Sequence, residues 1–203
     1  MKLWTIQPKV VVDAIRRGET YVCNPSLSPH VGKDAVMAEH FVNAYNWISS
    51  RLDKVTPRPE GVQYPVWAWH TWWGRRCSPD LNHVMFEGTE DNSAILELDI
   101  PEKELLLTSM EMYNYVLNNS IAVTDKEWIE WEEKGIDDEM CSFKWFMERC
   151  RHHLELSWDK HVIVPSNHTT TEQSIQACYW KLEPHQLGWK QFPKPPQATY
   201  GPA

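Results

Sequence analysis

The stretch over residues 64–73 reads Tyr64-Pro65-Val66-Trp67-Ala68-Trp69-His70-Thr71-Trp72-Trp73. Its aromatic and β-branched content is typical of a β-strand. Alternation along a strand puts Trp67, Trp69, Thr71 and Trp73 on one face, and Tyr64, Val66, Ala68, His70 and Trp72 on the other. Because both faces carry aromatic side chains, this strand is either central and covered on both sides or borders a flat cavity.

Outward from this stretch, hydrophobic spacing predicts strands over residues 2–7, 20–23, 94–100, 105–107 and 174–182. It predicts one helix that contains Val11 and Ile15, one that contains Met37 and Leu52, and two more over residues 109–118 and 142–156. The capping box Thr124-x-x-Glu127 opens a further helix.

The helices are grouped between the strands and do not alternate with them regularly. We therefore expect an α+β fold, with a small split antiparallel or mixed sheet flanked by helices. A single domain is expected over residues 1–192, followed by a proline-rich tail over residues 193–203.

Composition excludes several classes of protein. The 203 residues are 42% hydrophobic and 24% charged, as in ordinary globular domains, but they include twelve tryptophans. A net charge of −8 does not favour an extended nucleic-acid interface. No apolar run approaches the roughly 20 residues of a membrane span, and no secretory leader is visible, so we expect no membrane association and a cytoplasmic location.

The five cysteines are Cys23, Cys77, Cys141, Cys150 and Cys178. Their odd number and wide spacing, without a C-x-x-C, indicate reduced thiols and argue against a zinc ribbon or a disulfide framework. The adjacent His152 and His153 do not have the i, i+4 spacing of a metal-binding pair on a helix, so no metal site is expected. P-loop, dinucleotide-binding and serine-hydrolase motifs are also absent from the sequence.

Two groups of residues are candidates for ligand binding. Aromatic walls suit planar rings such as nicotinamide and nucleobases, and Arg75 and Arg76 directly after the strand suit a phosphate, unless they are ordinary surface arginines. Gln176 stands on an apolar strand face, and Thr5 and Gln7 take the matching place on the first strand. If those strands are neighbours, these polar groups form either a structural hydrogen-bond cluster or part of a ligand site.

Four segments carry a resemblance to a known family: Lys2–Pro8, the stretch from Tyr64 to Leu81, the stretch from Leu96 to Asn118, and Ile175–Ala177. Together, in this order, they resemble an uncharacterised bacterial and phage family with a domain of unknown function. More remotely, the order of elements is similar to that of the ADP-ribosyltransferase superfamily. That resemblance implies an ADP-ribosyltransferase-like fold and NAD as the ligand.

The superfamily places an Arg or His on its first strand, an aromatic or Ser residue on a middle strand, and a Glu on a late strand. Here the corresponding places hold Thr5 or Gln7, the residues from Trp67 to His70, and Gln176, with Glu172 just upstream. The residue types therefore depart from the pattern, and a glutamine cannot act as an anionic base.

Two hypotheses follow. In the first, the protein is an enzyme that transfers ADP-ribose from NAD to a protein or nucleic-acid acceptor. Tyr64, Trp67 or Trp69 stacks a ring, and Thr5 and Gln7 bind the carboxamide or ribose. Arg75 or Arg76 binds the diphosphate, and Gln176 or Glu172 orients the reacting group. In the second, a non-catalytic module on the same frame binds a nucleotide or a protein, acting in phage–host conflict.

Overall fold

The structure, a computed structural model, describes residues 1–25, 35–88, 90–133, 144–168 and 173–188. Its centre is a six-stranded sheet of order β4-β1-β3-β7-β5-β6, in which all neighbouring strands are antiparallel. These strands are β1 (Lys2–Pro8), β3 (Val66–Thr71), β4 (Ser93–Asp99), β5 (Leu106–Ser109), β6 (Ile163–Val164) and β7 (Ile175–Tyr179). A second, two-stranded sheet pairs β2 (Tyr21–Val22) with β8 (Lys181–Leu182).

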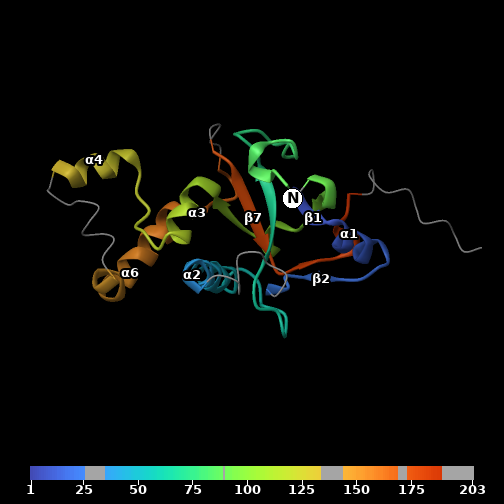
Figure 1. Ribbon diagram of the computed structural model, residues 1–203, viewed down its shortest axis with the longest axis horizontal. Helices are drawn as coiled ribbons and strands as arrows, with labels where there is room; N and C mark the ends of the chain where they lie inside the picture. Colours follow the sequence, from blue (N-terminus) through green and yellow to red (C-terminus); the bar gives the residue numbers. More distant parts are fainter. Residues whose placement is uncertain (26–34, 89, 134–143, 169–172, 189–203) are drawn as a thin grey trace, which may run out of the picture.

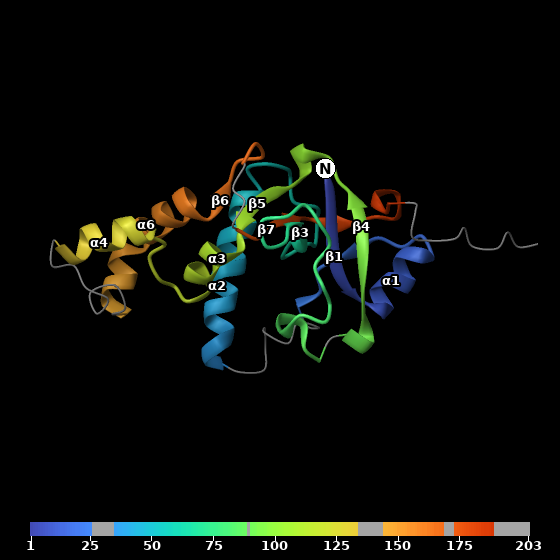
Figure 2. The same cartoon turned by 90° about the horizontal axis from the view of Figure 1, so that it is seen from above.

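The helices gather mainly on one side of the large sheet (Figures 1 and 2). There α2 (Ala35–Leu52), α3 (Met110–Leu117), α4 (Asp125–Glu133) and α6 (Lys144–His161) lie together, while α1 (Lys9–Arg16) lies at the opposite end of the molecule. Short 3₁₀ turns include η2 (Val84–Phe86), η4 (Glu102–Glu104) and η5 (Pro184–Gln186). The α+β class predicted from the sequence is confirmed.

The sheet has a hydrophobic core on each face. On the first face, Leu3, Val66 and Ala68 pack with Val11 and Ile15 of α1. On the second face, the side chains come from the sheet and from three helices: Leu106, Cys178, Trp47, Ile48, Val116, Leu154 and Trp158, with Trp67 packed against them. β3 is therefore a central strand covered on both faces, which was the first of the two alternatives for the aromatic stretch.

Two predicted strands end earlier than expected. The register of the β3–β7 pair shifts between Trp69 and Thr71, and β3 ends at Thr71. The stretch 174–182 is two strands, because the chain leaves the large sheet at Trp180, whose indole Nε1–H donates to the carbonyl of Thr56 at 3.0 Å.

The predicted capping box is confirmed, since Thr124 N–H donates to Glu127 Oε2 at 2.9 Å and Glu127 N–H donates to Thr124 Oγ1 at 3.3 Å.

Cys23, Cys77 and Cys178 are free among the described residues, whereas Cys141 and the side chain of Cys150 lie outside them, so the absence of disulfides stays a prediction. Burial raises the pKa of the Cys178 thiol, which behaves as a small apolar side chain in the core. Within the described ranges, no helix is long and apolar enough to cross a membrane.

Candidate functional site

A tight turn follows β3 and has an unusual residue at its first central position. Trp72 and Arg75 exchange two backbone hydrogen bonds, of 2.8 and 2.9 Å, and the two residues between them, Trp73 and Gly74, have φ of 46° and 71°. Positive φ at both central residues is the mark of a type I′ turn, where Asn, Asp or Gly is usual at the first position. A bulky side chain held there costs about 1–3 kcal/mol.

The start of β7 fixes this strained turn in place. The backbone N–H of Trp73 donates to Ser174 Oγ at 3.1 Å, and the N–H of Gly74 donates to the carbonyl of Gln173 at 3.2 Å. Ser174 is itself fully buried. The conformation of Trp73 is therefore imposed by tertiary contacts.

The Trp73 side chain remains 54% exposed. Its ring lies 5.9 Å from that of Trp72 and 6.0 Å from that of His83. Trp72 is buried and packs edge-to-face on Trp69 at 4.8 Å. Val84 and Met85, which follow His83, are also exposed, so an exposed aromatic ring stands on a buried aromatic stack with aliphatic side chains nearby.

The two predicted phosphate ligands have different surroundings. The Arg76 guanidinium donates to the carbonyls of Lys2, at 2.7 Å, and His70, and lies 5.6 Å from the centre of the Trp4 ring. Burial lowers its pKa. Arg75 is exposed, and its side chain makes no hydrogen bond or ion pair within the part of the chain that the structure describes. Arg75 is thus the cation available to a ligand, while Arg76 holds β1 against β3.

Gln176 stands in a row of residues that crosses the second face of the sheet. Register places Trp4 opposite Trp69, Trp69 opposite Gln176, and Gln176 opposite Thr108. Gln176 is half-buried, and its amide has no hydrogen-bond partner among the described residues. The hydroxyl of Thr108 is buried and also unpartnered within those ranges.

Other polar atoms of this face also have no hydrogen-bond partner in the part of the chain that the structure describes. They are the indole Nε1 of Trp67, the indole Nε1 of Trp47 and the hydroxyl of Tyr113, all buried. Buried polar groups are normally hydrogen-bonded, so this concentration calls for water or a ligand that supplies partners.

Thr5 and Gln7 do not join Gln176, which corrects the expectation of a shared polar cluster. β3 lies between β1 and β7, so the two strands are not neighbours. Thr5 and Gln7 lie on the same face of β1 as Leu3, which is the first face of the sheet. Gln176 precedes Ala177, which lies on the first face, so Gln176 lies on the second face. Gln7 Nε2 donates to Thr5 Oγ1 at 2.7 Å, and Thr5 Oγ1 donates to the carbonyl of Trp67 at 2.7 Å. These two residues form the structural hydrogen-bond cluster that was the other alternative.

The expected stacking residues are packed by protein rings. Trp67 lies 5.0 Å from Tyr113 and 6.4 Å from Tyr45, and Tyr45 lies 5.2 Å from Tyr64. Burial raises the pKa of Tyr64, whose hydroxyl accepts a hydrogen bond from Gln63. The walls of the expected cleft, formed by Trp67 and Trp69, are therefore filled by side chains.

His70 sits beside the same strand end. One ring nitrogen lies 2.8 Å from Thr71 Oγ1, and burial, with Arg76 nearby, lowers the pKa of His70 to about 4. A neutral imidazole can donate and accept hydrogen bonds at neutral pH but carries no charge for a phosphate.

Sequence reasoning missed Glu111 and Ser174. The Glu111 carboxylate accepts hydrogen bonds from Ser174 N–H at 2.9 Å and from Ser109 Oγ at 3.3 Å, joining the start of α3 to the ends of β5 and β7. The signal was present, because Ser109 followed two residues later by an acid is typical of a helix start. Glu172, the alternative catalytic residue, lies outside the described residues.

At one end of the sheet the structure thus places an exposed ring, an exposed arginine and a half-buried amide, those of Trp73, Arg75 and Gln176, with the buried hydroxyl of Thr108 beside the amide. The described part of the chain contains no cluster of side chains suited to a metal ion. No curated protein and no solved structure matches the chain. A family model, described as a domain of unknown function, matches residues 2–187, which include every described strand and helix.

Proposed function

We propose a ligand for this chain, which belongs to the domain-of-unknown-function family DUF3841. It binds a nucleotide at the Trp72–Arg75 turn, and NAD is the first candidate. One observation carries the proposal: the ring of Trp73 is held exposed, at φ 46°, beside an arginine that has no described partner. The sequence-based expectation of a stacked ring next to a phosphate-binding arginine is retained, and its place moves from Trp67 and Trp69 to Trp73.

Folding alone does not account for Trp73. Asparagine or glycine would adopt this backbone conformation at lower cost, and neither would expose an aromatic ring to water. Stacking of a base on an aromatic side chain is worth about 1–3 kcal/mol, comparable to the cost of the strained turn. The guanidinium of Arg75 suits the geometry of a phosphate.

Gln176 and Thr108 extend the site toward the sheet. Gln176 lies beside Trp69, on which Trp72 packs, and so stands at the same end of the sheet as the turn. The half-buried amide of Gln176, which has no partner among the described residues, suits the carboxamide of nicotinamide or the edge of a nucleobase.

Binding without chemistry is the better supported form of the proposal. Gln176 cannot act as an anionic base, and the Glu111 carboxylate is already engaged by two hydrogen bonds. Transfer of ADP-ribose to a macromolecule is the second candidate, favoured by the position of Glu111 between the ends of the strands that carry Thr108 and Gln176. The hypothesis of a non-catalytic module in phage–host conflict corresponds to binding without chemistry.

A binding panel tests the proposal. NAD, ADP-ribose, nicotinamide mononucleotide, nicotinamide alone and ribose 5-phosphate are added to the full chain. At 100 times its dissociation constant, a ligand stabilises by about 2.7 kcal/mol, which raises the melting temperature by roughly 5–10 °C for a protein of this size. We expect the compounds that contain both ring and phosphate to bind, and the two fragments to bind more weakly.

Chromatography of NAD after long incubation with the protein distinguishes binding alone from transfer of ADP-ribose. Unchanged NAD together with a thermal shift supports binding alone, and released nicotinamide supports transfer or hydrolysis. Absence of a shift with every compound at millimolar concentration contradicts the proposal.

A further inference from the structure

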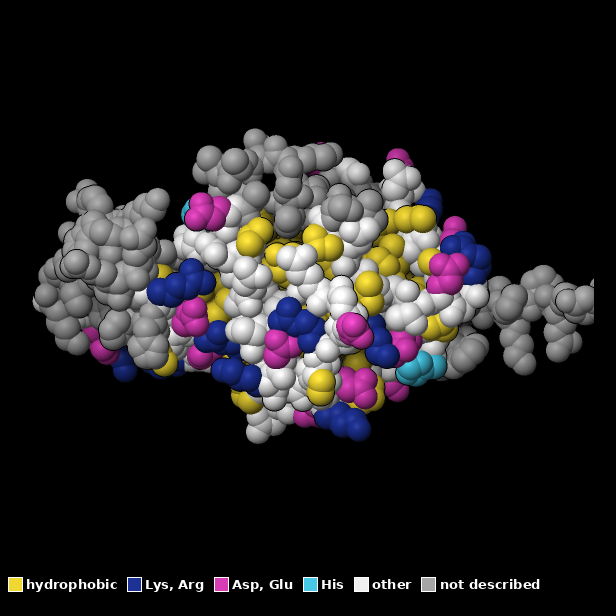
Figure 3. Space-filling model, turned by 90° about the horizontal axis from the view of Figure 1, so that it is seen from below, with side chains coloured by type: hydrophobic (Ala, Val, Ile, Leu, Met, Phe, Trp, Pro, Cys, Tyr) yellow, Lys and Arg dark blue, Asp and Glu magenta, His cyan; other side chains and the backbone are white. Residues whose placement is uncertain are grey.

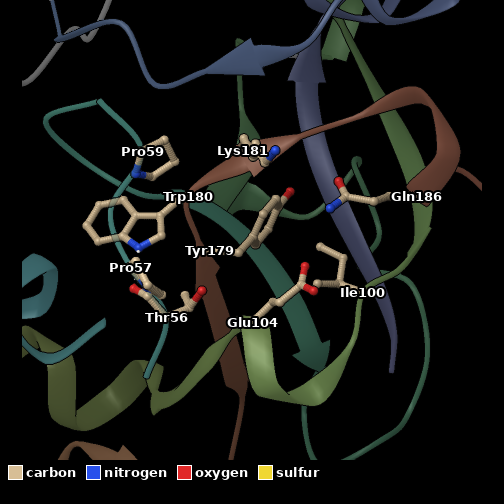
Figure 4. Close-up of a pocket in the computed structure, with 9 residues that line it drawn as sticks. All are labelled: Thr56, Pro57, Pro59, Ile100, Glu104, Tyr179, Trp180, Lys181 and Gln186. Atoms are coloured by element: carbon tan, nitrogen blue, oxygen red, sulfur yellow. Dashed lines mark hydrogen bonds between the residues drawn. The ribbon is translucent and has the colours of Figure 1, made fainter. Parts of the chain in front are cut away.

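A small pocket lies away from the aromatic turn, where the loop after α2 meets β8. It has a volume of about 60 Å³ and is lined by Thr56, Pro57, Pro59, Ile100, Glu104, Tyr179, Trp180, Lys181 and Gln186. By this measure of volume a cavity needs about 10–15 Å³ to hold one water, so the pocket accommodates several waters or one small end group of a larger ligand. Figure 3 shows hydrophobic side chains gathered across one face of the molecule, and Figure 4 shows the pocket itself.

The pocket has flat, rigid walls on one side. The rings of Trp180, Pro57 and Pro59 lie together there (Figure 4). Trp180 is buried and fixed by its hydrogen bond to Thr56. The guanidinium carbon of Arg58 lies 4.7 Å from the centre of its ring, which is a cation–π distance, so this indole already has a planar cation beside it.

The opposite side supplies polar groups. The side chain of Gln186 is buried and its Oε1 already accepts a hydrogen bond from Glu183 N–H at 2.8 Å, so the free acceptor on this side of the pocket is the carboxylate of Glu104. Glu104 extends its carboxylate toward Tyr179 and Ile100 (Figure 4). That carboxylate is half-buried and makes no hydrogen bond or ion pair within the described ranges.

The charges of the lining segments leave this carboxylate uncompensated. Lys181 Nζ is paired with Glu183 at 3.0 Å, and Arg58 is paired with Asp53 at 2.6 Å. The other two charged residues of η4, Glu102 and Lys103, are exposed and do not line the pocket. Their opposite charges offset one another. The pocket therefore favours a cation.

We propose that this pocket binds a guanidinium group, such as the end of an arginine side chain or of a small guanidino compound. A guanidinium is planar, matches the flat walls, and presents two N–H groups to a carboxylate in parallel. This site is independent of the nucleotide site, because it shares no residue with the Trp72–Arg75 turn.

The indole N–H of Trp180 gives a direct reporter, since it lies at the pocket wall. Methylguanidinium chloride is titrated into the ¹⁵N-labelled full chain at constant ionic strength, and the Trp180 indole resonance is followed. We expect a saturable shift for the unmodified protein and for Glu102→Gln, the matched control on the same turn. In Glu104→Gln, the apparent affinity should fall at least tenfold.

Three further titrations identify the ligand. Urea, a neutral planar analogue, and methylammonium should bind at least tenfold more weakly. Nα-acetyl-arginine amide should shift the same resonance if the source is a peptide, whereas binding of methylguanidinium alone indicates a free small molecule. Equal responses to urea, or an unchanged titration in Glu104→Gln with the fold intact, would overturn the proposal.

Discussion

At the scale of single residues, two neighbouring arginines have different surroundings. Arg76 hydrogen-bonds two backbone carbonyls from β1 and β3, while Arg75 is exposed. We predict that Arg76→Ala lowers the free energy of unfolding by about 1–3 kcal/mol, because hydrogen bonds to a charged group are lost. Arg75→Ala should change stability by less than about 0.5 kcal/mol but weaken nucleotide binding.

Urea denaturation and calorimetric titration, carried out on both variants, measure the two effects. The assignment of roles is wrong if Arg75→Ala is the destabilising change, or if only Arg76→Ala weakens nucleotide binding after correction for the unfolded fraction.

His70 provides a pH-dependent prediction. Burial and Arg76 lower its pKa from 6.5 to about 4, so between these values the unfolded chain binds a proton that the folded chain does not. The contribution to stability is fully present above pH 6.5 and is lost as the pH falls toward 4. His70→Gln should flatten this part of the stability profile, whereas His185→Gln, a change at an exposed histidine, should leave it as it is.

The sequence predicts an aromatic ring beside a phosphate-binding arginine, which stays a prediction, and it does not predict how the strands place these residues. Alternation assigned Thr5, Gln7 and Gln176 to strands, yet which face each strand presents depends on register, which short-range patterns do not specify. For the same reason Trp73 was grouped with Trp67 and Trp69. A register shift and a turn separate it from them.

At the scale of elements, the Trp72–Arg75 turn gives a test of strain against function. Trp73→Asn places at this position a residue that favours positive φ. We predict that the variant is at least as stable as the parent, by up to about 1 kcal/mol, and that its nucleotide affinity falls roughly ten- to a hundredfold, as expected from the loss of a stacking platform. Chemical denaturation and calorimetry check the two outcomes.

Trp72→Ala serves as a contrast, since Trp72 is buried, and should cost about 3–5 kcal/mol of stability. If Trp73→Asn were strongly destabilising and bound nucleotides normally, Trp73 would be a structural residue.

Long elements with clear periodicity were predictable, and short ones were not. The helix that ends at Leu52, the strand around Leu96 and Leu98 and the capping box at Thr124 were all found from local patterns. β6 has two residues, and at the break Trp180 donates a hydrogen bond to the carbonyl of Thr56, 124 residues earlier in the chain. Such features are determined by tertiary contacts and leave little local signal.

At the scale of the whole molecule, the domain boundary remains a prediction that truncation can test. A chain ending at residue 192 keeps every described element and should melt at the same temperature as the full chain. A chain ending at residue 172 lacks β7, the strand that joins β3 to β5, and should not fold. Circular dichroism and thermal melts distinguish the outcomes. Cooperative melting of the shorter chain would show that β7 is dispensable.

The strand order also determines when this protein can fold during its synthesis. β3 is complete at Thr71, but its partner β7 begins at Ile175, about a hundred residues later. At roughly 5–20 residues per second, a ribosome needs on the order of 5–20 seconds to cover that distance. Throughout this interval Trp67 and Trp69 belong to a strand with an open edge, and an aromatic strand with an open edge pairs readily with other chains. We therefore expect the nascent chain to aggregate less when chaperones or slow expression protect the open edge of β3 until β7 is synthesised.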